Sequence, residues 1–154
     1  MMSESPGMTA SQAYAVLQQY SSDGGAPGVD AAYGYGILNL GWAMNGGNAA
    51  RVDTAVSSHY YNNQTGQMEF VIQNRSGVTV NGMQLFITDS AAQNAYTIPA
   101  LAPGASTVVS VPVNQVELSR SLTGVTYRSQ LMNPQGLTDV VPFNNQKASA
   151  VGKR

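Results

Sequence analysis

"QMEFVIQNRSGVTVNGMQLFI", residues 67–87, is the stretch that decides the fold. It opens with an alternating run, in which the apolar side chains are Met68, Phe70 and Ile72 and the polar ones are Gln67, Glu69 and Gln73. An apolar residue at every second position is typical of a β-strand with one buried face. We therefore predict that Phe70 and Ile72 are buried and that Gln67 and Glu69 face water.

The same period of two continues on both sides of this stretch. Seven short runs show it: 52–60, 67–73, 83–87, 96–98, 109–113, 125–131 and 146–151. Turn-forming residues separate the runs, as at Asn81-Gly82 and Pro103-Gly104. Seven short strands punctuated in this way over about 100 residues are typical of an antiparallel sandwich of immunoglobulin-like type. The sequence thus predicts a mainly β protein, with this seven-stranded sandwich over residues 48–154.

The first of these runs carries the single histidine of the chain. Its alternation places these residues on one face of the strand: Val52, Thr54, Val56, Ser58 and Tyr60. His59 is then expected to face solvent beside Tyr60 and Tyr61. A general base or metal ligand at His59 needs partners, and Asp53 lies about 20 Å away along the strand. We expect no catalytic or metal-binding role for His59.

Residues 1–47 follow a different period and form the predicted helical N-terminal segment. Apolar residues at helical spacing predict an amphipathic helix over residues 9–22: Ala13, Val16, Leu17 and Tyr20. Thr9 and Gln12 form a capping box at its start, and Asp23-Gly24-Gly25 ends it. A second, short helix over 40–44 has Asn39 as its N-cap. Because a helix of about 14 residues is marginal alone in water, this segment needs a surface to pack on.

Composition excludes several classes of function. Of the 154 residues 10% are charged, the net charge is −1, and no run of Lys or Arg occurs. Nucleic acids and anionic membranes are bound through basic patches, so we expect neither as a partner. No apolar run approaches the roughly 20 residues of a membrane span. The absence of cysteine excludes disulfides, thiolate metal sites and a cysteine nucleophile.

Residues 9–45, "TASQAYAVLQQYSSDGGAPGVDAAYGYGILNLGWAMN", resemble the last segment of the catalytic domain of subtilisin-like serine proteases. In that family a helix leads through a glycine-rich loop to a D-x-x-x-G-x-G-x-hydrophobic-N element and a closing short helix. The positions that match this pattern are Thr9, Gln12, Asp30, Gly34, Gly36 and Asn39. Both the order and the spacing of the elements agree.

The catalytic Asp, His and Ser of that family lie in upstream motifs, and none of these motifs occurs here. The resemblance implies that the chain is the non-catalytic C-terminal portion of an exported bacterial subtilisin-like endopeptidase. Its partner would be the upstream catalytic domain. The whole protein would be secreted or attached to the cell surface. The start, "MMSESPGMT", lacks the features of a signal peptide, which leaves a cytoplasmic protein or a downstream piece of a longer exported chain.

Residues 48–154 resemble bacterial immunoglobulin-like modules of the adhesion-related, CARDB-like type. The resemblance rests on the turn at 74–77, on "LAPGAS" at 101–106 and on the pair Asn144-Asn145. Of the acidic residues that precede this pair in the family, only Asp139 is present. The resemblance implies an accessory module that positions substrate, anchors the enzyme or aids folding. A stand-alone extracellular adhesion, carbohydrate-binding or protein-binding module is the alternative.

Aromatic side chains are the candidates for ligand binding. Tyr60 and Tyr61 would contact a polysaccharide or a peptide from the first strand. Trp42 belongs to the same candidate patch, but we expect it to pack between the two regions. Without a catalytic domain the large side chains of the N-terminal segment need cover, so we expect this segment to dock on the sandwich or on a second copy of the chain. The side chains concerned are Val16, Leu17, Tyr20, Ile37, Leu38 and Trp42.

No cofactor is expected, with one alternative left open. Asp23 and Asp30 flank the glycine-rich loop, where turn formation is their ordinary role. A structural calcium ion is the alternative, although calcium takes six to eight oxygen ligands and the loop offers two carboxylates besides its carbonyls. The Gly34-x-Gly36 pattern half-matches a dinucleotide loop, but it lacks the third glycine and the preceding strand.

Overall fold

The computed structural model describes residues 7–152, and within them the chain is mainly β, with nine strands in three sheets and a few short helices. The helices are α1 (Ala10–Gln19), α2 (Leu40–Asn45), α3 (Gln115–Arg120) and the 3-10 turn η1 (Pro142–Asn145). The strands are β1 (Ser21–Ser22), β2 (Ile37–Leu38), β3 (Thr54–Asn62), β4 (Gln67–Asn74), β5 (Gln84–Thr88), β6 (Gln93–Thr97), β7 (Ser106–Pro112), β8 (Val125–Met132) and β9 (Gln146–Val151).

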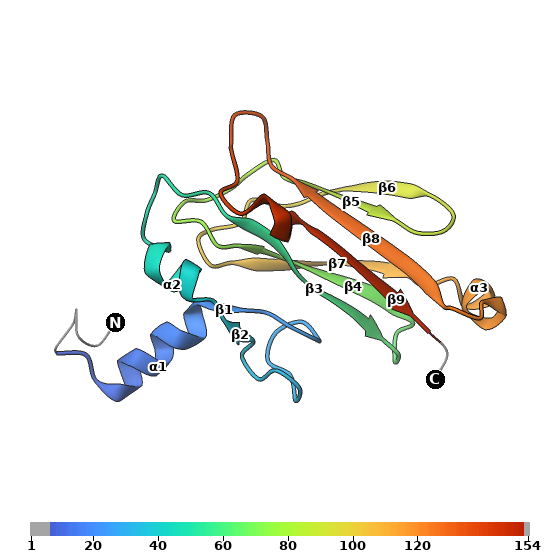
Figure 1. Ribbon diagram of the computed structural model, residues 1–154, viewed down its shortest axis with the longest axis horizontal. Coiled ribbons are helices and arrows are strands. Elements are labelled where there is room, and N and C mark those ends of the chain that lie inside the picture. Colours follow the sequence, from blue (N-terminus) through green and yellow to red (C-terminus); the bar gives the residue numbers. More distant parts are fainter. Residues whose placement is uncertain (1–6, 153–154) are drawn as a thin grey trace.

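Two of the sheets face each other and form a sandwich (Figure 1). One has the order β3-β4-β7 and the other the order β6-β5-β8-β9, and all neighbouring strands are antiparallel. The core between them is apolar and includes Phe70 of β4 and Tyr127 of β8, whose ring centroids lie 6.0 Å apart. Phe70 and Ile72 are both fully buried, which confirms the face predicted for β4.

The described residues hold nine strands rather than seven, because the segment predicted as helical contains two more. Each of the seven predicted runs overlaps one strand of the sandwich, from β3 to β9. The two additional strands, β1 and β2, pair with each other in the N-terminal part of the chain, with Ser21 opposite Leu38 and Ser22 opposite Ile37. A ladder of two residues is too short to show an alternating pattern in the sequence.

The alternation predicted along β3 is wrong beyond Val56. A β-bulge interrupts the pairing of β3 with β4: Val56 lies opposite Ile72, and Ser58 lies opposite the adjacent Val71. The extra residue, Ser57, shifts the rest of the strand by one position relative to β4. Side chains alternate with a period of two, so a shift of one position moves each of them to the other face. Residues that follow the bulge therefore exchange faces relative to the sequence pattern.

The segment from residue 9 to residue 45, here the front segment, lies against the sandwich (Figure 1). It covers part of the outer face of the β3-β4-β7 sheet, where Val71 is 1% and Gln73 is 6% exposed although both point away from the core. The side-chain amide of Gln73 donates to the Ser21 carbonyl at 3.2 Å, and the Ser58 hydroxyl donates to the Gly25 carbonyl at 2.6 Å. The part of this outer face around Val71 and Gln73 is therefore an internal surface.

Trp42 of α2 anchors the front segment. It is 1% exposed, its ring stacks edge-on against Tyr20 at 5.4 Å, and it borders the turn at Gly104 between the sheets. The prediction that Trp42 is buried is confirmed. Docking is nevertheless partial, since Leu17, Ile37 and Leu38 remain at least 40% exposed. The segment touches the sandwich along one side only, and the other side faces away.

Candidate functional site

The front segment begins with the capping box predicted from the sequence. The Gln12 backbone N–H donates to the Thr9 hydroxyl at 3.3 Å, and the Thr9 N–H donates to the Gln12 side-chain carbonyl at 2.8 Å. These two bonds satisfy N–H groups that a helix leaves unpaired at its start. No residue of α1 is buried, so this helix is held by its cap and its connection to β1 rather than by core packing.

Asp30 organises the glycine-rich loop that follows. Its Oδ1 atom accepts hydrogen bonds from the backbone N–H groups of Ala32 and Tyr33, at 2.6 and 2.8 Å. The loop closes through two backbone hydrogen bonds between Asp30 and Gly34. Gly34 has a φ of +59°, a conformation that favours glycine. The predicted motif residues Asp30 and Gly34 therefore form one tight turn.

Gly36 and Asn39 join this turn to the rest of the segment. Gly36 has a φ of +106°, and a Cβ atom there would collide with the Ser22 carbonyl oxygen. Asn39 caps α2, because its Oδ1 atom accepts from the Trp42 N–H at 2.9 Å, while its side-chain amide donates to the Ser22 hydroxyl at 3.3 Å. The motif thus holds the backbone that places Trp42.

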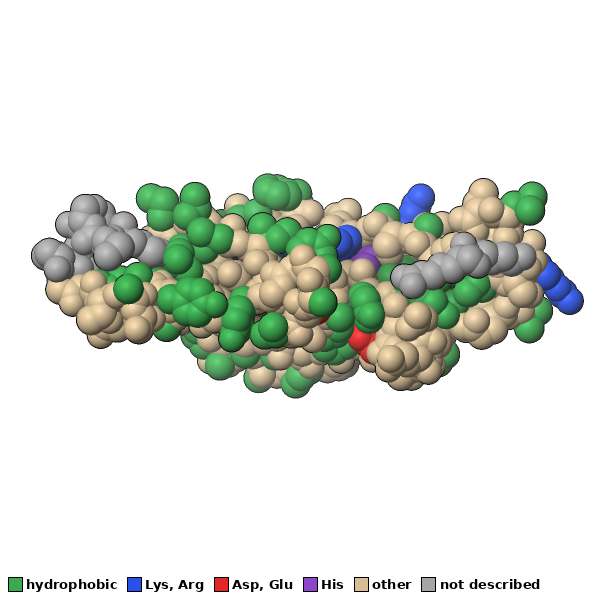
Figure 2. All heavy atoms as spheres, turned by 90° about the horizontal axis from the view of Figure 1, so that it is seen from below, with side chains coloured by type: hydrophobic (Ala, Val, Ile, Leu, Met, Phe, Trp, Pro, Cys, Tyr) green, Lys and Arg blue, Asp and Glu red, His purple; other side chains and the backbone are tan. Residues whose placement is uncertain are grey.

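The exposed surface of the front segment is strongly apolar. Among residues 7–152, sixteen large apolar side chains are exposed, and nine of them lie between residues 14 and 44. We call these nine the apolar face: Tyr14, Leu17, Val29, Tyr33, Tyr35, Ile37, Leu38, Leu40 and Met44. Figure 2 shows hydrophobic side chains gathered over the left and central parts of the view from this side. Exposed apolar side chains gathered in this way are typical of interaction surfaces.

The structure separates Tyr60 and Tyr61, the tyrosines predicted to bind a ligand together. They are neighbours on β3, so their side chains point to opposite faces of the sheet. Tyr61 packs against the hydrophobic core, whereas Tyr60 lies on the outer face. Trp42 is buried elsewhere, and the three rings form no common patch.

Tyr60 lines an open hollow of about 530 Å³ on the outer face of the β3-β4-β7 sheet. Its floor includes Glu69 of β4, which lies directly opposite Tyr60 in the sheet register, and Val108 of β7. The β3–β4 turn and residues 26–27 of the front segment form its sides. The front segment therefore helps to build this hollow.

His59 lies between the two sheets, so the prediction of a solvent-facing histidine is wrong. The bulge at Ser57 turns its side chain inward, where its ring packs edge-on against Phe70 at 4.6 Å. Its Nδ1 atom is 2.8 Å from the Ser149 hydroxyl, and its Nε2 atom is 2.7 Å from the Ser129 hydroxyl. Burial, and secondarily the charge of Lys147, lowers the pKa of His59 to about 4. His59 is therefore neutral near pH 7.

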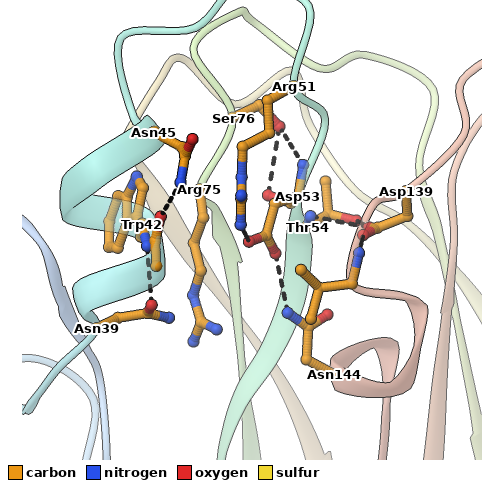
Figure 3. A network of polar contacts seen from close by, with 12 residues as sticks. Asn39, Trp42, Asn45, Arg51, Asp53, Thr54, Arg75, Ser76, Asp139 and Asn144 are labelled. Carbon is orange, nitrogen blue, oxygen red and sulfur yellow. Dashed lines mark hydrogen bonds and ion pairs between the residues drawn. The ribbon is translucent and has the colours of Figure 1, made fainter.

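A polar network that the sequence did not predict closes one end of the sandwich (Figure 3). Asp139 accepts three hydrogen bonds at 2.9 Å through its Oδ2 atom, from the Thr54 N–H, the Thr54 hydroxyl and the Asn145 amide. Asp53, which is 1% exposed, accepts from the Asn144 amide at 2.9 Å and pairs with Arg51 at 3.0 Å.

The network fixes the start of β3 to the chain around η1. The sequence signals available for it were Asp139 and the Asn144-Asn145 pair, which the CARDB-like resemblance had singled out. Arg75 is also buried nearby, and burial lowers the pKa of its guanidinium while the charges of Asp53 and Asp139 oppose that change. The network pairs Asp53, Thr54 and Asp139, while Arg51 Nε and Asn144 Oδ1 stay buried without a hydrogen-bond partner among the described residues.

Among the residues that the structure describes, Asp23 and Asp30 each keep one buried carboxylate oxygen without a hydrogen-bond partner, Oδ1 and Oδ2 respectively. Burial raises the pKa of Asp23, and the charge of Asp30 adds to the rise. A calcium ion takes six to eight oxygen ligands, and these two carboxylate oxygens would supply only two of them. Within residues 7–152 no three His, Asp or Glu side chains gather as a metal-binding group. The calcium alternative stays a prediction.

No protein-family model matches the sequence, and no curated protein is similar to it. Two solved structures of the CARDB domain of the PF1109 protein from Pyrococcus furiosus are similar in fold. The crystal structure, in complex with di-metal ions, has a TM-score of 0.43 and 14% identity over 56% of this chain and 71% of that chain. The solution NMR structure has a TM-score of 0.41 and 14% identity over 56% of this chain and 78% of that chain.

These similarities do not concern the resemblance of residues 9–45 to subtilisin-like proteases, which stays a prediction. None of the helices within residues 7–152 has both the length and the apolar composition needed to cross a bilayer.

Proposed function

We propose that this chain is the non-catalytic C-terminal portion of an exported subtilisin-like serine endopeptidase. In this proposal residues 1–47 belong to the end of the catalytic domain, and residues 48–154 are an immunoglobulin-like, CARDB-like accessory module. The enzyme would be bacterial and secreted or attached to the cell surface. The observation that carries the proposal is the apolar face of the front segment.

The apolar face supports the proposal because it lies in the segment whose sequence resembles the end of a catalytic domain. Ile37 is 60%, Leu40 63% and Met44 81% exposed. Burial of such side chains contributes about 25 cal/mol per Å² of apolar surface, so a covering domain would stabilise the assembly by several kcal/mol. A surface of this kind in a folded segment is expected where a second domain packs.

The inner side of the front segment supports the accessory role. Trp42 is buried, and hydrogen bonds join Gln73 to Ser21 and Ser58 to Gly25. A catalytic domain packed on the apolar face would therefore be held at a fixed position relative to the sandwich. Such an arrangement suits a module that positions substrate or stabilises the enzyme better than one on a flexible tether.

The hydroxyl groups near His59 do not amount to a nucleophilic site. Ser129 is only 4% exposed, and within the described residues no carboxylate is hydrogen-bonded to the imidazole. A serine becomes an effective nucleophile when a base with a pKa near the working pH removes its proton, and the pKa of His59 is about 4. We therefore propose that the chain by itself hydrolyses no peptides and is not labelled by a fluorophosphonate serine probe.

Labelling of the native protein tests the proposal. Culture fluid of the producing cells is treated with a fluorophosphonate probe, and antiserum raised against residues 48–154 is used for precipitation. We expect a labelled protein of a mass well above 16.2 kDa, together with casein-degrading activity in the precipitate. Recovery of the unlabelled 16.2 kDa chain alone would contradict the proposal that the chain is part of a protease, and it would favour a stand-alone module. The purified chain serves as the unlabelled control.

A further inference from the structure

The hollow beside Tyr60 has the chemistry of a carbohydrate subsite. We propose that it binds a neutral saccharide chain through the Tyr60 ring, the Glu69 carboxylate and the side-chain amides of Asn63 and Gln64. This inference concerns the sandwich and goes beyond the proposed function. It stands whether or not a catalytic domain precedes the chain.

The floor of the hollow offers an aromatic ring beside a hydrogen-bond acceptor. Tyr60 and Glu69 are directly paired across β3 and β4, and both point away from the core. Side chains opposite each other in an antiparallel pair have Cβ atoms about 5 Å apart. A tyrosine presents an apolar ring together with a polar hydroxyl, which suits a sugar ring that has apolar C–H faces and hydroxyl edges.

The polar groups of the hollow are only partly used within the described part of the chain. One oxygen of Glu69, Oε1, accepts from the Asn62 amide at 3.0 Å, which leaves the second oxygen available. The side-chain amides of Asn63 and Gln64 make no hydrogen bond with the residues that the structure describes. A free carboxylate oxygen accepts from hydroxyl groups, and free amides both donate and accept, as sugar hydroxyls do.

Charge and shape favour a neutral chain molecule. Glu69 is the sole charged side chain among the residues that line the hollow, and its carboxylate already holds an amide. A cationic peptide would find one partly occupied carboxylate, whereas a hydroxyl donating to that carboxylate forms a charge-assisted hydrogen bond. The hollow is open to solvent, which allows a polymer to enter and leave it.

The test uses the full 154-residue chain and four probes: cellohexaose, chitohexaose, maltohexaose and a lysine decapeptide. Each is titrated while the backbone amide signals are followed by NMR. We expect at least one hexasaccharide to shift the signals of residues 60–69 with a dissociation constant of about 1 mM or below. No shift with any of the three sugars at about ten times that concentration would overturn the proposal, as would binding of the decapeptide alone.

Variants identify the groups that bind. Tyr60→Ala is expected to weaken saccharide binding about tenfold or more, Glu69→Gln several-fold, and Tyr60→Phe less than Tyr60→Ala. Tyr35→Ala, which removes a tyrosine that is 53% exposed outside the hollow, is the matched control and should leave the affinity unchanged. Trp42 fluorescence checks that each variant keeps its front segment docked. Equal affinities of Tyr60→Ala and Tyr35→Ala would overturn the assignment.

Discussion

The Nε2 atom of His59 lies 2.7 Å from the Oγ atom of Ser129, so a side chain of the three-stranded sheet is hydrogen-bonded to one of the four-stranded sheet. Ser149 of β9 completes the arrangement on the other ring nitrogen. A neutral imidazole has one N–H group, so it donates to one hydroxyl and accepts from the other. The ring links the sheets in its uncharged form.

This position makes stability depend on pH. The pKa of His59 is about 4 in the folded chain and about 6.5 when unfolded, so the unfolded chain binds more protons between these values. The His59 contribution is complete above pH 6.5 and is lost as the pH falls toward 4. We expect a loss of about 1–2 kcal/mol between pH 7 and pH 5, after allowance for partial exposure of the ring. Urea melts at both pH values measure it.

The single histidine makes the control simple. His59→Gln should be less stable at pH 7, and its stability should change little between pH 7 and pH 5. An equally steep pH dependence in this variant would show that another group is responsible.

Phe70 and Glu69 test the two faces of β4. Phe70 is fully buried against Tyr127, and Phe70→Ala should cost about 3–5 kcal/mol. Glu69 points away from the core, and Glu69→Ala should change the free energy of unfolding by about 0.5 kcal/mol or less. Denaturant melts compare the two variants directly. Similar losses would mean that the strand register is incorrect.

Trp42 reports whether the front segment is docked. Because it is 1% exposed, its emission should lie well to the blue of free tryptophan, and acrylamide should quench it poorly. Trp42→Ala should release the front segment and speed chymotryptic cleavage at Tyr33 and Tyr35, while the sandwich itself stays folded. Leu40→Ala, at a position 63% exposed, is the control that should not release the segment. Free-tryptophan emission from the unmodified chain would exclude docking.

Gly36 should be the least replaceable glycine of the motif. Gly36→Ala places a Cβ atom against the Ser22 carbonyl at a φ of +106°, and we expect a cost of about 2–3 kcal/mol. Gly34→Ala has a φ of +59° but open space around it, and should cost about 1 kcal/mol. The denaturant midpoint of Trp42 fluorescence measures both. Equal midpoints would argue against close packing of the turn on β1.

The apolar face predicts that the isolated chain binds hydrophobic molecules and associates with itself. We expect it to bind a hydrophobic dye and to self-associate at high concentration, because Ile37 and Leu40 are each at least 60% exposed. The double variant Ile37→Ser with Leu40→Ser should reduce both effects. Val116→Ser, at a position 58% exposed on α3, should not. Sedimentation analysis that finds only monomer for every form would contradict this expectation.

Local chemistry was readable from the sequence alone. The alternation around Phe70 determined the buried face of β4, since side-chain direction along a strand has a fixed period of two. The capping box of Thr9 and Gln12 and the cap at Asn39 were equally predictable, because each depends on residues three positions apart. The seven runs of the sandwich were predictable because an alternation of apolar and polar residues is also a local pattern.

The tertiary structure decided which of these surfaces are free. A one-residue bulge at Ser57 turned His59 inward and left Tyr60 outside, and no local pattern marks such an insertion. Gln73 points away from the core and is nevertheless buried, because Ser21, 52 positions earlier, lies over it. The bond from Thr54 to Asp139 spans 85 positions. A sequence pattern reports the direction of a side chain, whereas burial depends on which distant segment packs there.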